Sequence, residues 1–484
     1  MTMLPNIVTS ADLHTIIPEM FVCAAAFGLL MVDLFLSPQR RGLTHFLALL
    51  ILVAAAVLTV RDMASVQTFA FSNFFVRDVA SDVLKMAMYG VTALVFIYAK
   101  PFLQDRDLFK GEFYALVLFA LLGMMLMVSA GGLITLYLGL ELLALSAYGL
   151  VALDRDNPIA SEAAMKYFIL GSLASGLLLY GMSMIYGVTG SLQLDEIYAA
   201  SAVSGGSTLL SLGVVFMLVG IAFKFGAAPF HMWLPDVYQG APTAVTLFIG
   251  SAPKLAYFGM AYRLLESGVG PMDVEWRVML AWLAAASLIV GNVIALAQTN
   301  FKRLLAYSTI SHVGFLFMGL ANASPLGYAA SMFYALSYAV MGAAAFAAII
   351  LLSRRGFDAE NISDFRGLWK TNPLHALLIL FIMASLAGVP PFLGFWAKLV
   401  VIGAALDAGM TWLAIVAVVC AVLGAFYYLR IIRAMFFEEP EGDGAQIHPD
   451  SHLRIAFALN AVALLVLGIF AEPLLHWCQT AFPV

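Results

Sequence analysis

Residues Phe223–Thr243 read FKFGAAPFHMWLPDVYQGAPT, an apolar run interrupted at its centre by glycine and proline. Pro229 lacks a backbone donor, so it breaks a helix in its interior. A second stretch, Gly388–Phe392, reads GVPPF and repeats the G-x-x-P-F pattern within another long apolar run. In lipid, the carbonyls freed by such a break are tolerated only where protein or a wet cavity covers them. The two stretches therefore predict a membrane protein with two interrupted helices.

The composition supports the same fold class. Hydrophobic residues make up 63% of the 484 residues and charged residues only 11%, against about 25% charged residues in soluble domains. Apolar runs recur at about 20 residues, the length that a helix needs to cross a bilayer, whereas spanning strands need only about 10. We predict an all-α integral membrane protein with fourteen transmembrane helices, near 15–36, 43–60, 79–99, 112–129, 131–152, 160–186, 207–238, 243–264, 276–298, 303–321, 327–353, 374–406, 409–434 and 453–474.

The basic residues predict the orientation. Of 24 lysines and arginines, fifteen fall in loops reached after odd-numbered spans and four in the loops on the other side. Because cytoplasmic loops are rich in basic residues, both termini are expected on the outer side of the membrane. No lysine or arginine precedes Arg40, so the first apolar run is not expected to be a cleaved signal peptide.

The two interrupted runs also predict an internal repeat. Helices four to eight, in 112–264, would match helices nine to thirteen, in 276–436, with the interruptions in helices seven and twelve. An odd number of helices inverts the second copy, and paired broken helices point to a transport site. Helices one to three, in 1–111, and helix fourteen, in 453–484, would flank the repeats. The alternative is that both proline sites are simple kinks.

Five charged residues lie deep in apolar sequence: Glu141, Lys166, Lys224, Lys254 and Lys398. A charge at the bilayer centre costs about 2.5–3.5 kcal/mol on insertion scales. Desolvation favours the neutral amine, and lysine, unlike arginine, can release its proton in a protein. We therefore expect a proton relay in which Glu141 faces Lys224 or Lys166. The alternative is a set of static ion pairs.

Two histidines are further candidates for the relay. His231 lies in the first interruption, and His312 lies among hydroxyl residues. Imidazole titrates near neutral pH, although a membrane histidine is often a packing residue. Lys85, Glu19 and Asp33 lie nearer to span ends, where we expect them to reach toward the interface instead of conducting.

Several other functions find no support. The three cysteines are far apart and no C-x-x-C occurs, so neither an iron–sulfur cluster nor a cysteine zinc site is expected. Neither a dinucleotide-binding G-x-G-x-x-G after a strand nor a phosphate-binding G-x-x-x-x-G-K-[ST] occurs. No basic run suggests nucleic acid. We expect no cofactor and no metal in this chain, and the lipid bilayer as its surroundings.

Phe223–Thr243 and a second string, Asn300–His312, resemble the hallmark motifs of the antiporter-like membrane subunits of respiratory complex I and of Mrp-type sodium/proton antiporters. The resemblance covers nearly the whole chain. Complex I contains three branches of this family. Two features separate this chain from the M and L branches. The M branch carries glutamate where this chain has Lys398, and the L branch continues into a long lateral helix where this chain ends at Val484.

The resemblance implies a proton-translocating subunit of NADH:quinone oxidoreductase in a bacterial inner membrane, coupled to quinone reduction in other subunits. It implies that Glu141 is the acid, that Lys166 and Lys224 are its partners, that Lys254 is the central link and that Lys398 is the terminal site. The two histidines fall within matched motifs and would assist. NADH, flavin, iron–sulfur clusters and quinone would belong to partner subunits of the complex.

Three alternatives stay open. A sodium or potassium/proton antiporter subunit would produce ion-dependent pH changes on its own. A solute symporter would need a varied polar pocket at the two breaks, where the sequence offers mainly lysines. A purely structural subunit would tolerate loss of the lysines.

Overall fold

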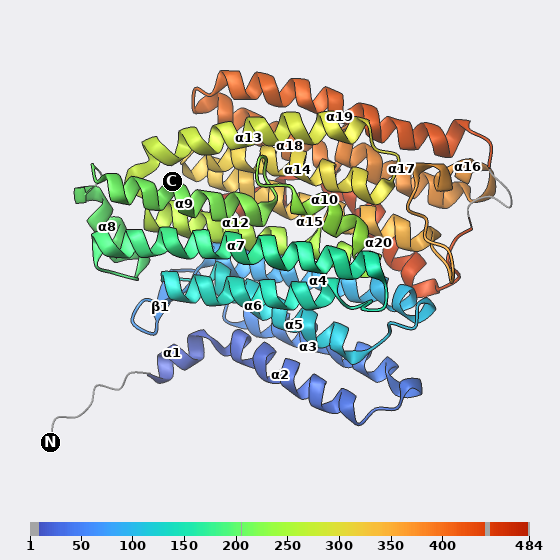
Figure 1. The fold of residues 1–484 in the computed structure, drawn as a ribbon, viewed down its shortest axis with the longest axis horizontal. Coiled ribbons are helices and arrows are strands. Elements are labelled where there is room, and N and C mark those ends of the chain that lie inside the picture. The colour runs from blue at the N-terminus through green and yellow to red at the C-terminus, as the bar shows by residue number, and fades with distance from the viewer. Residues whose placement is uncertain (1–8, 205, 441–445, 483–484) are drawn as a thin grey trace.

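The computed structural model describes residues 9–204, 206–440 and 446–482, and almost every element in them is a helix. Figure 1 shows long helices lying side by side, with α2 (Ile17–Leu34) and α3 (Gly42–Arg61) at one edge and α19 (Thr411–Phe437) at the opposite edge. Within the described residues, twelve segments are long and apolar enough to cross a membrane. They coincide with twelve of the predicted spans, so the prediction of a helical membrane protein is confirmed.

The N-terminal part holds three of these segments and one feature that the sequence did not predict. A short antiparallel hairpin pairs Thr68 with Arg77 and precedes α4. Phe71, Ser72 and Asn73 have positive φ angles, which make the tight turn between its strands. The further elements are α1 (Ser10–Thr15), η1 (Pro38–Arg40), β1 (Thr68–Ala70), β2 (Phe75–Arg77) and α4 (Val79–Asp105).

The middle part begins with three long helices and then becomes more broken. Its elements are α5 (Gly111–Val128), α6 (Leu133–Val151), α7 (Pro158–Thr189), α8 (Leu194–Ser204), α9 (Thr208–Phe225), α10 (Trp233–Gly240), α11 (Thr243–Ile249), α12 (Ala252–Tyr262) and the π-helical turn η2 (Arg263–Gly268).

The C-terminal part likewise combines long helices with shorter ones. Its elements are η3 (Gly270–Met272), α13 (Asp273–Leu296), α14 (Phe301–Leu320), α15 (Pro325–Leu352), η4 (Ile362–Phe365), α16 (Leu368–Thr371), α17 (Pro373–Ala387), α18 (Leu393–Asp407), α19, α20 (Ser451–Ile469) and α21 (Glu472–Thr480).

Both predicted interruptions are present. The helix α9 ends before Gly226, and α17 ends before Gly388; these glycines have φ angles of +77° and +85°. A left-handed glycine commonly ends a helix because it has no Cβ to clash. A third break, at Gly250 and Ser251 between α11 and α12, was not predicted. It lies directly before Pro253 at the start of α12.

Two predicted spans are not among the twelve. The span near 303–321 corresponds to α14, a single helix whose basic and hydroxyl side chains make it less apolar. The span near 374–406 is divided into α17 and α18, each of 15 residues. The count of fourteen spans therefore stays a prediction.

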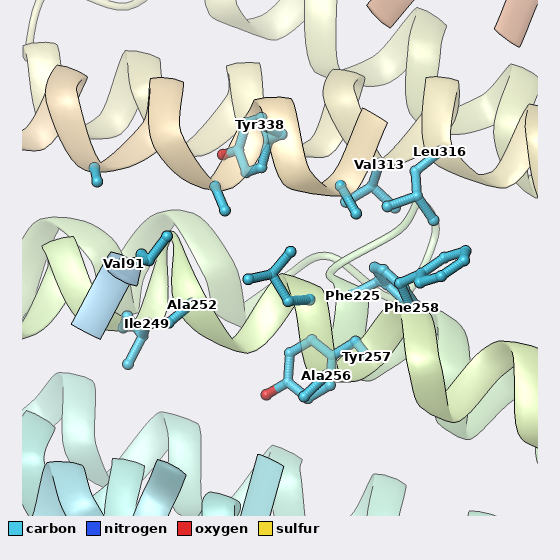
Figure 2. Packing of buried hydrophobic residues seen from close by; sticks show 14 of the residues in the cluster. Val91, Phe225, Ile249, Ala252, Ala256, Tyr257, Phe258, Val313, Leu316 and Tyr338 are labelled. Atoms are coloured by element: carbon cyan, nitrogen blue, oxygen red, sulfur yellow. The ribbon is translucent and has the colours of Figure 1, made fainter. Parts of the chain in front are cut away.

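Burial differs sharply between the centre and the edges. The segment Thr243–Gly268 and the helix α15 are almost wholly buried, whereas less than a third of α2 and α3 is buried. Figure 2 shows this centre, where Phe225, Ala256 and Phe258 lie opposite Val313 and Leu316. The exposed residues at the edges are themselves apolar, as expected of a surface that faces lipid or other membrane subunits.

Candidate functional site

Lys224 lies in the last turn of α9, at the first interruption. Its side chain is 5% exposed, and Nζ donates to Ser175 Oγ of α7 at 2.9 Å. Trp233, the first residue of α10, connects the two sides of the interruption: its indole Nε1 donates to the Phe223 carbonyl of α9 at 2.9 Å. The site is thus a buried amine beside a helix end that neighbouring side chains hold in place.

Lys254 meets the same interruption from α12. Its side chain is 1% exposed, and Nζ donates to the Phe225 carbonyl at 2.7 Å. The last carbonyls of a helix lack partners within the helix and carry the negative end of its dipole, so they favour a protonated amine. The unpredicted break before α12 brings Lys254 to the end of α9. The residue that it binds there, Phe225, directly follows Lys224 in the sequence.

Lys398 repeats this arrangement at the second interruption. Its side chain is 8% exposed, and Nζ donates to the carbonyls of Leu386 and Ala387 at 2.9 and 2.8 Å. These are the last residues of α17 before Gly388. In both matched G-x-x-P-F segments the peptide bond before the motif proline is cis. Lys254 and Lys398 therefore each cap the C-terminal end of an interrupted helix.

Glu141 lies in α6, with its Oε1 buried and without a hydrogen-bond partner in the described part of the chain. This carboxylate was expected to face Lys224 or Lys166. Among the described residues, however, no ion pair within 4.0 Å joins Glu141 to a lysine or arginine. The expectation that Glu141 faces Lys224 therefore stays a prediction.

Lys166 departs from its prediction. Its side chain is 43% exposed, and Nζ lies 2.9 Å from both Glu162 and Asp236. Asp236 also binds Arg303 at 2.8 Å. Neither deep burial nor a pair with Glu141 is observed, because α10, which begins after the first interruption, places Asp236 beside α7. The sequence analysis did not single out Asp236. Its place in the first turn of α10, where an acid is favourable, is the signal that could have indicated it.

The two histidines have different surroundings. His231 is half-buried within the first interruption and lies close to the Pro229 carbonyl. His312 is 4% exposed and is hydrogen-bonded through Nδ1 to Tyr334 Oη at 2.6 Å and through Nε2 to Tyr428 Oη at 3.2 Å. Which partner donates depends on the tautomer of the ring.

The hydrogen bonds of His312 continue through groups that the sequence analysis did not single out. The Tyr428 hydroxyl is hydrogen-bonded to Ser308. Close by, Tyr427 Oη donates to Asn292 Oδ1 at 3.2 Å, and Asn292 Nδ2 donates to Ser311 Oγ at 2.8 Å. These residues come from α13, α14 and α19, so no spacing in the sequence announces their meeting.

The expectation that Lys85 and Glu19 reach toward the interface is wrong. Their side chains are 1% and 2% exposed and form an ion pair at 2.7 Å inside the helix bundle. Asp33, by contrast, is half-buried near the end of α2 and accepts a hydrogen bond from Thr44 at 2.6 Å. Among the described residues, no group of three or more His, Cys, Asp or Glu side chains could hold a metal ion.

The fold and these buried amines define a class of membrane protein. Residues 130–424 match the family model described as "NADH:quinone oxidoreductase/Mrp antiporter, TM", and the chain belongs to this family. Within it, the chain is 55% identical to NADH-quinone oxidoreductase subunit N of Xanthomonas euvesicatoria over 98% of this chain and 97% of that protein. The same subunit of Thioalkalivibrio sulfidiphilus is 53% identical over 95% of this chain and 96% of that protein. These relatives place the chain in the subunit N branch.

Solved structures share the fold over almost the full length. A chain of respiratory complex I from Thermus thermophilus is 33% identical with a TM-score of 0.81, covering 95% of this chain and 98% of that chain. A chain of the Mrp complex from Dietzia sp. is 26% identical with a TM-score of 0.83, covering 97% of each.

Proposed function

We propose that this chain is a proton-translocating membrane subunit of an NADH:quinone oxidoreductase, and that protons pass through its buried amines. The observation that carries the proposal is the placement of three buried lysines at the interrupted helices: Lys224, Lys254 and Lys398. As a subunit it contributes to a translocase, while the redox chemistry with NADH, flavin, iron–sulfur clusters and quinone takes place on partner subunits of the complex.

The proposed topology has fourteen transmembrane helices, with both termini outside the inner membrane of a bacterium. Residues 112–264 and 276–436 form two inverted five-helix repeats, flanked by three helices in 1–111 and one in 453–484. The two G-x-x-P-F interruptions, in each of which the preceding helix ends at a left-handed glycine, support this correspondence.

Each capping lysine can hold or release a proton without moving far. While protonated, its ammonium group donates to the terminal carbonyls of the helix, which favour positive charge. After the proton leaves, the neutral amine keeps two N–H donors and stays near the same carbonyls. Moving one charge against 100 mV requires about 2.3 kcal/mol. A modest change in the electrostatic surroundings of one amine is therefore enough to drive the step.

We assign the switching of Lys224 to Glu141. Because no salt bridge holds the two together, a small movement of either helix changes their interaction without breaking a strong contact. From Lys224 the proton would pass to Lys254, whose amine is bound one residue further along at Phe225.

The second half would continue the path through His312 to Lys398. The His312 ring is hydrogen-bonded to hydroxyls on two sides. One of them belongs to Tyr334, which stacks on Phe315, and the centre of the Phe315 ring lies 5.4 Å from Lys398 Nζ. Lys166 and His231 would exchange protons nearer to the surface, where Asp236 gives Lys166 a second, reversible partner.

The test is Lys224→Ala in the assembled complex. We expect NADH oxidation to continue at a reduced rate with a clearly lower number of protons translocated per NADH, because the amine beside Glu141 is gone. Lys370→Ala is the matched control, since Lys370 lies in an exposed ion pair with Glu439. A wild-type proton ratio in Lys224→Ala vesicles, with normal assembly, would refute the proposed relay.

The similarity to the Mrp complex favours a second candidate, a cation/proton antiporter subunit. Vesicles that contain this chain alone would distinguish the two. Exchange of protons for sodium or potassium would favour the antiporter, whereas proton movement that depends on the complete complex and NADH favours the redox-driven pump.

A further inference from the structure

A second buried lysine–glutamate pair lies outside both repeats. Lys85 of α4 and Glu19 of α2 approach to 2.7 Å with side chains 1% and 2% exposed. The Lys85 amine also lies 4.0 Å from Asp82 Oδ1 and 5.5 Å from the centre of the Phe75 ring. Apart from Lys85, neither oxygen of Glu19 has a hydrogen-bond partner among the residues that the structure describes. Glu19 therefore depends on Lys85 alone, whereas Lys85 has Asp82 as a second, more distant acid.

The neighbouring ion pair is built differently. Arg77 Nε lies 3.2 Å from both oxygens of Asp82, and Arg77 Nη2 donates to the Thr59 carbonyl at 3.0 Å. Asp82 also accepts from the Ala64 amide at 2.9 Å. Several hydrogen bonds hold this pair, and arginine does not release its proton in proteins. It is a fixed anchor of the N-terminal helices, whereas Lys85 and Glu19 can neutralise each other by proton transfer.

A stripe of buried polar side chains leads inward from Lys85 along α4. Tyr89 and Thr92 follow at spacings of four and seven residues, which puts the three on one face of the helix. The Tyr89 hydroxyl is hydrogen-bonded to Thr59 of α3 at 3.2 Å. The Thr92 hydroxyl is buried and has no partner within the described ranges. Glu19 stands at the other end, in the first turn of α2, where α1 and the β1 hairpin lie (Figure 1).

We propose that Glu19 and Lys85 form an additional proton-exchange site of this chain, a proposal that rests on the proposed function. In the exchange, a Lys85 N–H bond breaks and an O–H bond forms on Glu19, leaving a neutral amine and a neutral acid. The acid then gives its proton to water at the nearby end of the bundle. The amine takes a proton from a donor that reaches it along Tyr89 and Thr92. One proton enters and one leaves in each cycle.

The alternative is a static clamp that fastens α2 to α4. Glu19→Leu combined with Lys85→Met separates the two, because it removes both charges and leaves no unpaired buried group. Such replacements of a buried ion pair by apolar residues of similar volume are often neutral for stability. We expect normal amounts of assembled complex and a proton-to-NADH ratio lowered to the level of Lys224→Ala.

Either of two results would overturn this inference. A wild-type proton ratio would show that the pair carries no protons, and failure of the double variant to assemble would show that the charges serve as a clamp. Lys224→Ala is measured in parallel. If it lowers the ratio while the double variant does not, only the additional site is refuted. If it leaves the ratio unchanged, the proposed function itself fails.

The polar stripe has its own matched control on the same helix. Tyr98 is also buried in α4, but its hydroxyl donates to the Ala456 carbonyl at 3.1 Å and lies outside the stripe. We expect Tyr89→Phe to slow proton translocation severalfold and Tyr98→Phe to leave it unchanged. Equal rates in the two variants would contradict conduction along this face.

Discussion

Gly388→Ala tests whether the position of Lys398 at the end of α17 matters for proton movement. A Cβ atom on Gly388 would lie 2.8 Å from Cδ of Lys398 and 3.2 Å from its Nζ. Because these atoms belong to a flexible side chain, the lysine is the part that must shift. The substitution therefore displaces the amine while changing few other contacts.

The size of the effect follows from two contributions. A left-handed conformation at a residue with a Cβ costs about 1–2 kcal/mol. A hydrogen bond from a charged group contributes about 1.5–3 kcal/mol. Loss of one of the two bonds to Leu386 and Ala387 therefore changes the equilibrium between bound and displaced amine by roughly tenfold to a hundredfold, in favour of the displaced amine.

Gly409→Ala is the matched control. Gly409 has a φ angle of +76°, and a Cβ there would meet nothing within 4 Å. Both variants therefore carry the same backbone penalty, and only Gly388→Ala moves Lys398. Thermal unfolding of the purified complex measures the shared loss of stability, and dye quenching in inverted vesicles measures proton transport at a matched rate of NADH oxidation. Equal proton ratios in the two variants would refute the assignment of Lys398.

Two other substitutions follow from the geometry of the first half. Ser175→Ala removes the acceptor of Lys224 Nζ, which should lower the proton ratio, and an unchanged ratio would indicate that water replaces the hydroxyl. Lys166→Ala should lower it much less than Lys224→Ala, because exposed ion pairs contribute little and Arg303 continues to bind Asp236. A loss as large as that of Lys224→Ala would contradict this ranking.

The sequence was informative wherever a local property decides the structure. The length of an apolar run decides whether it can span a membrane, so twelve of the predicted spans reappear as long apolar helical segments. Glycine and proline act on their own backbone, so the breaks at Gly226 and Gly388 were predictable. The break at Gly250 was missed although Gly250 and Pro253 have the same spacing as the glycine and proline of the two motifs, because we predicted breaks only from the full G-x-x-P-F pattern.

The binding partners of the charged side chains were less predictable than the positions of the helices and their breaks. The sequence does not show which acid Lys166 binds, and the packing of α10 against α7 selects Asp236. Glu19 and Lys85 are 66 positions apart and each lies near a helix end, which gave no sign of their buried contact.

The sequence by itself determined that this is a helical membrane protein with two interrupted helices and lysines beside them, because hydrophobic length and backbone chemistry are properties of single segments. The tertiary structure decided which carbonyls the amines bind, as with Lys254 at Phe225 and Lys398 at Leu386 and Ala387. Those contacts depend on how helices pack and where their ends meet, and packing is a property of the whole chain.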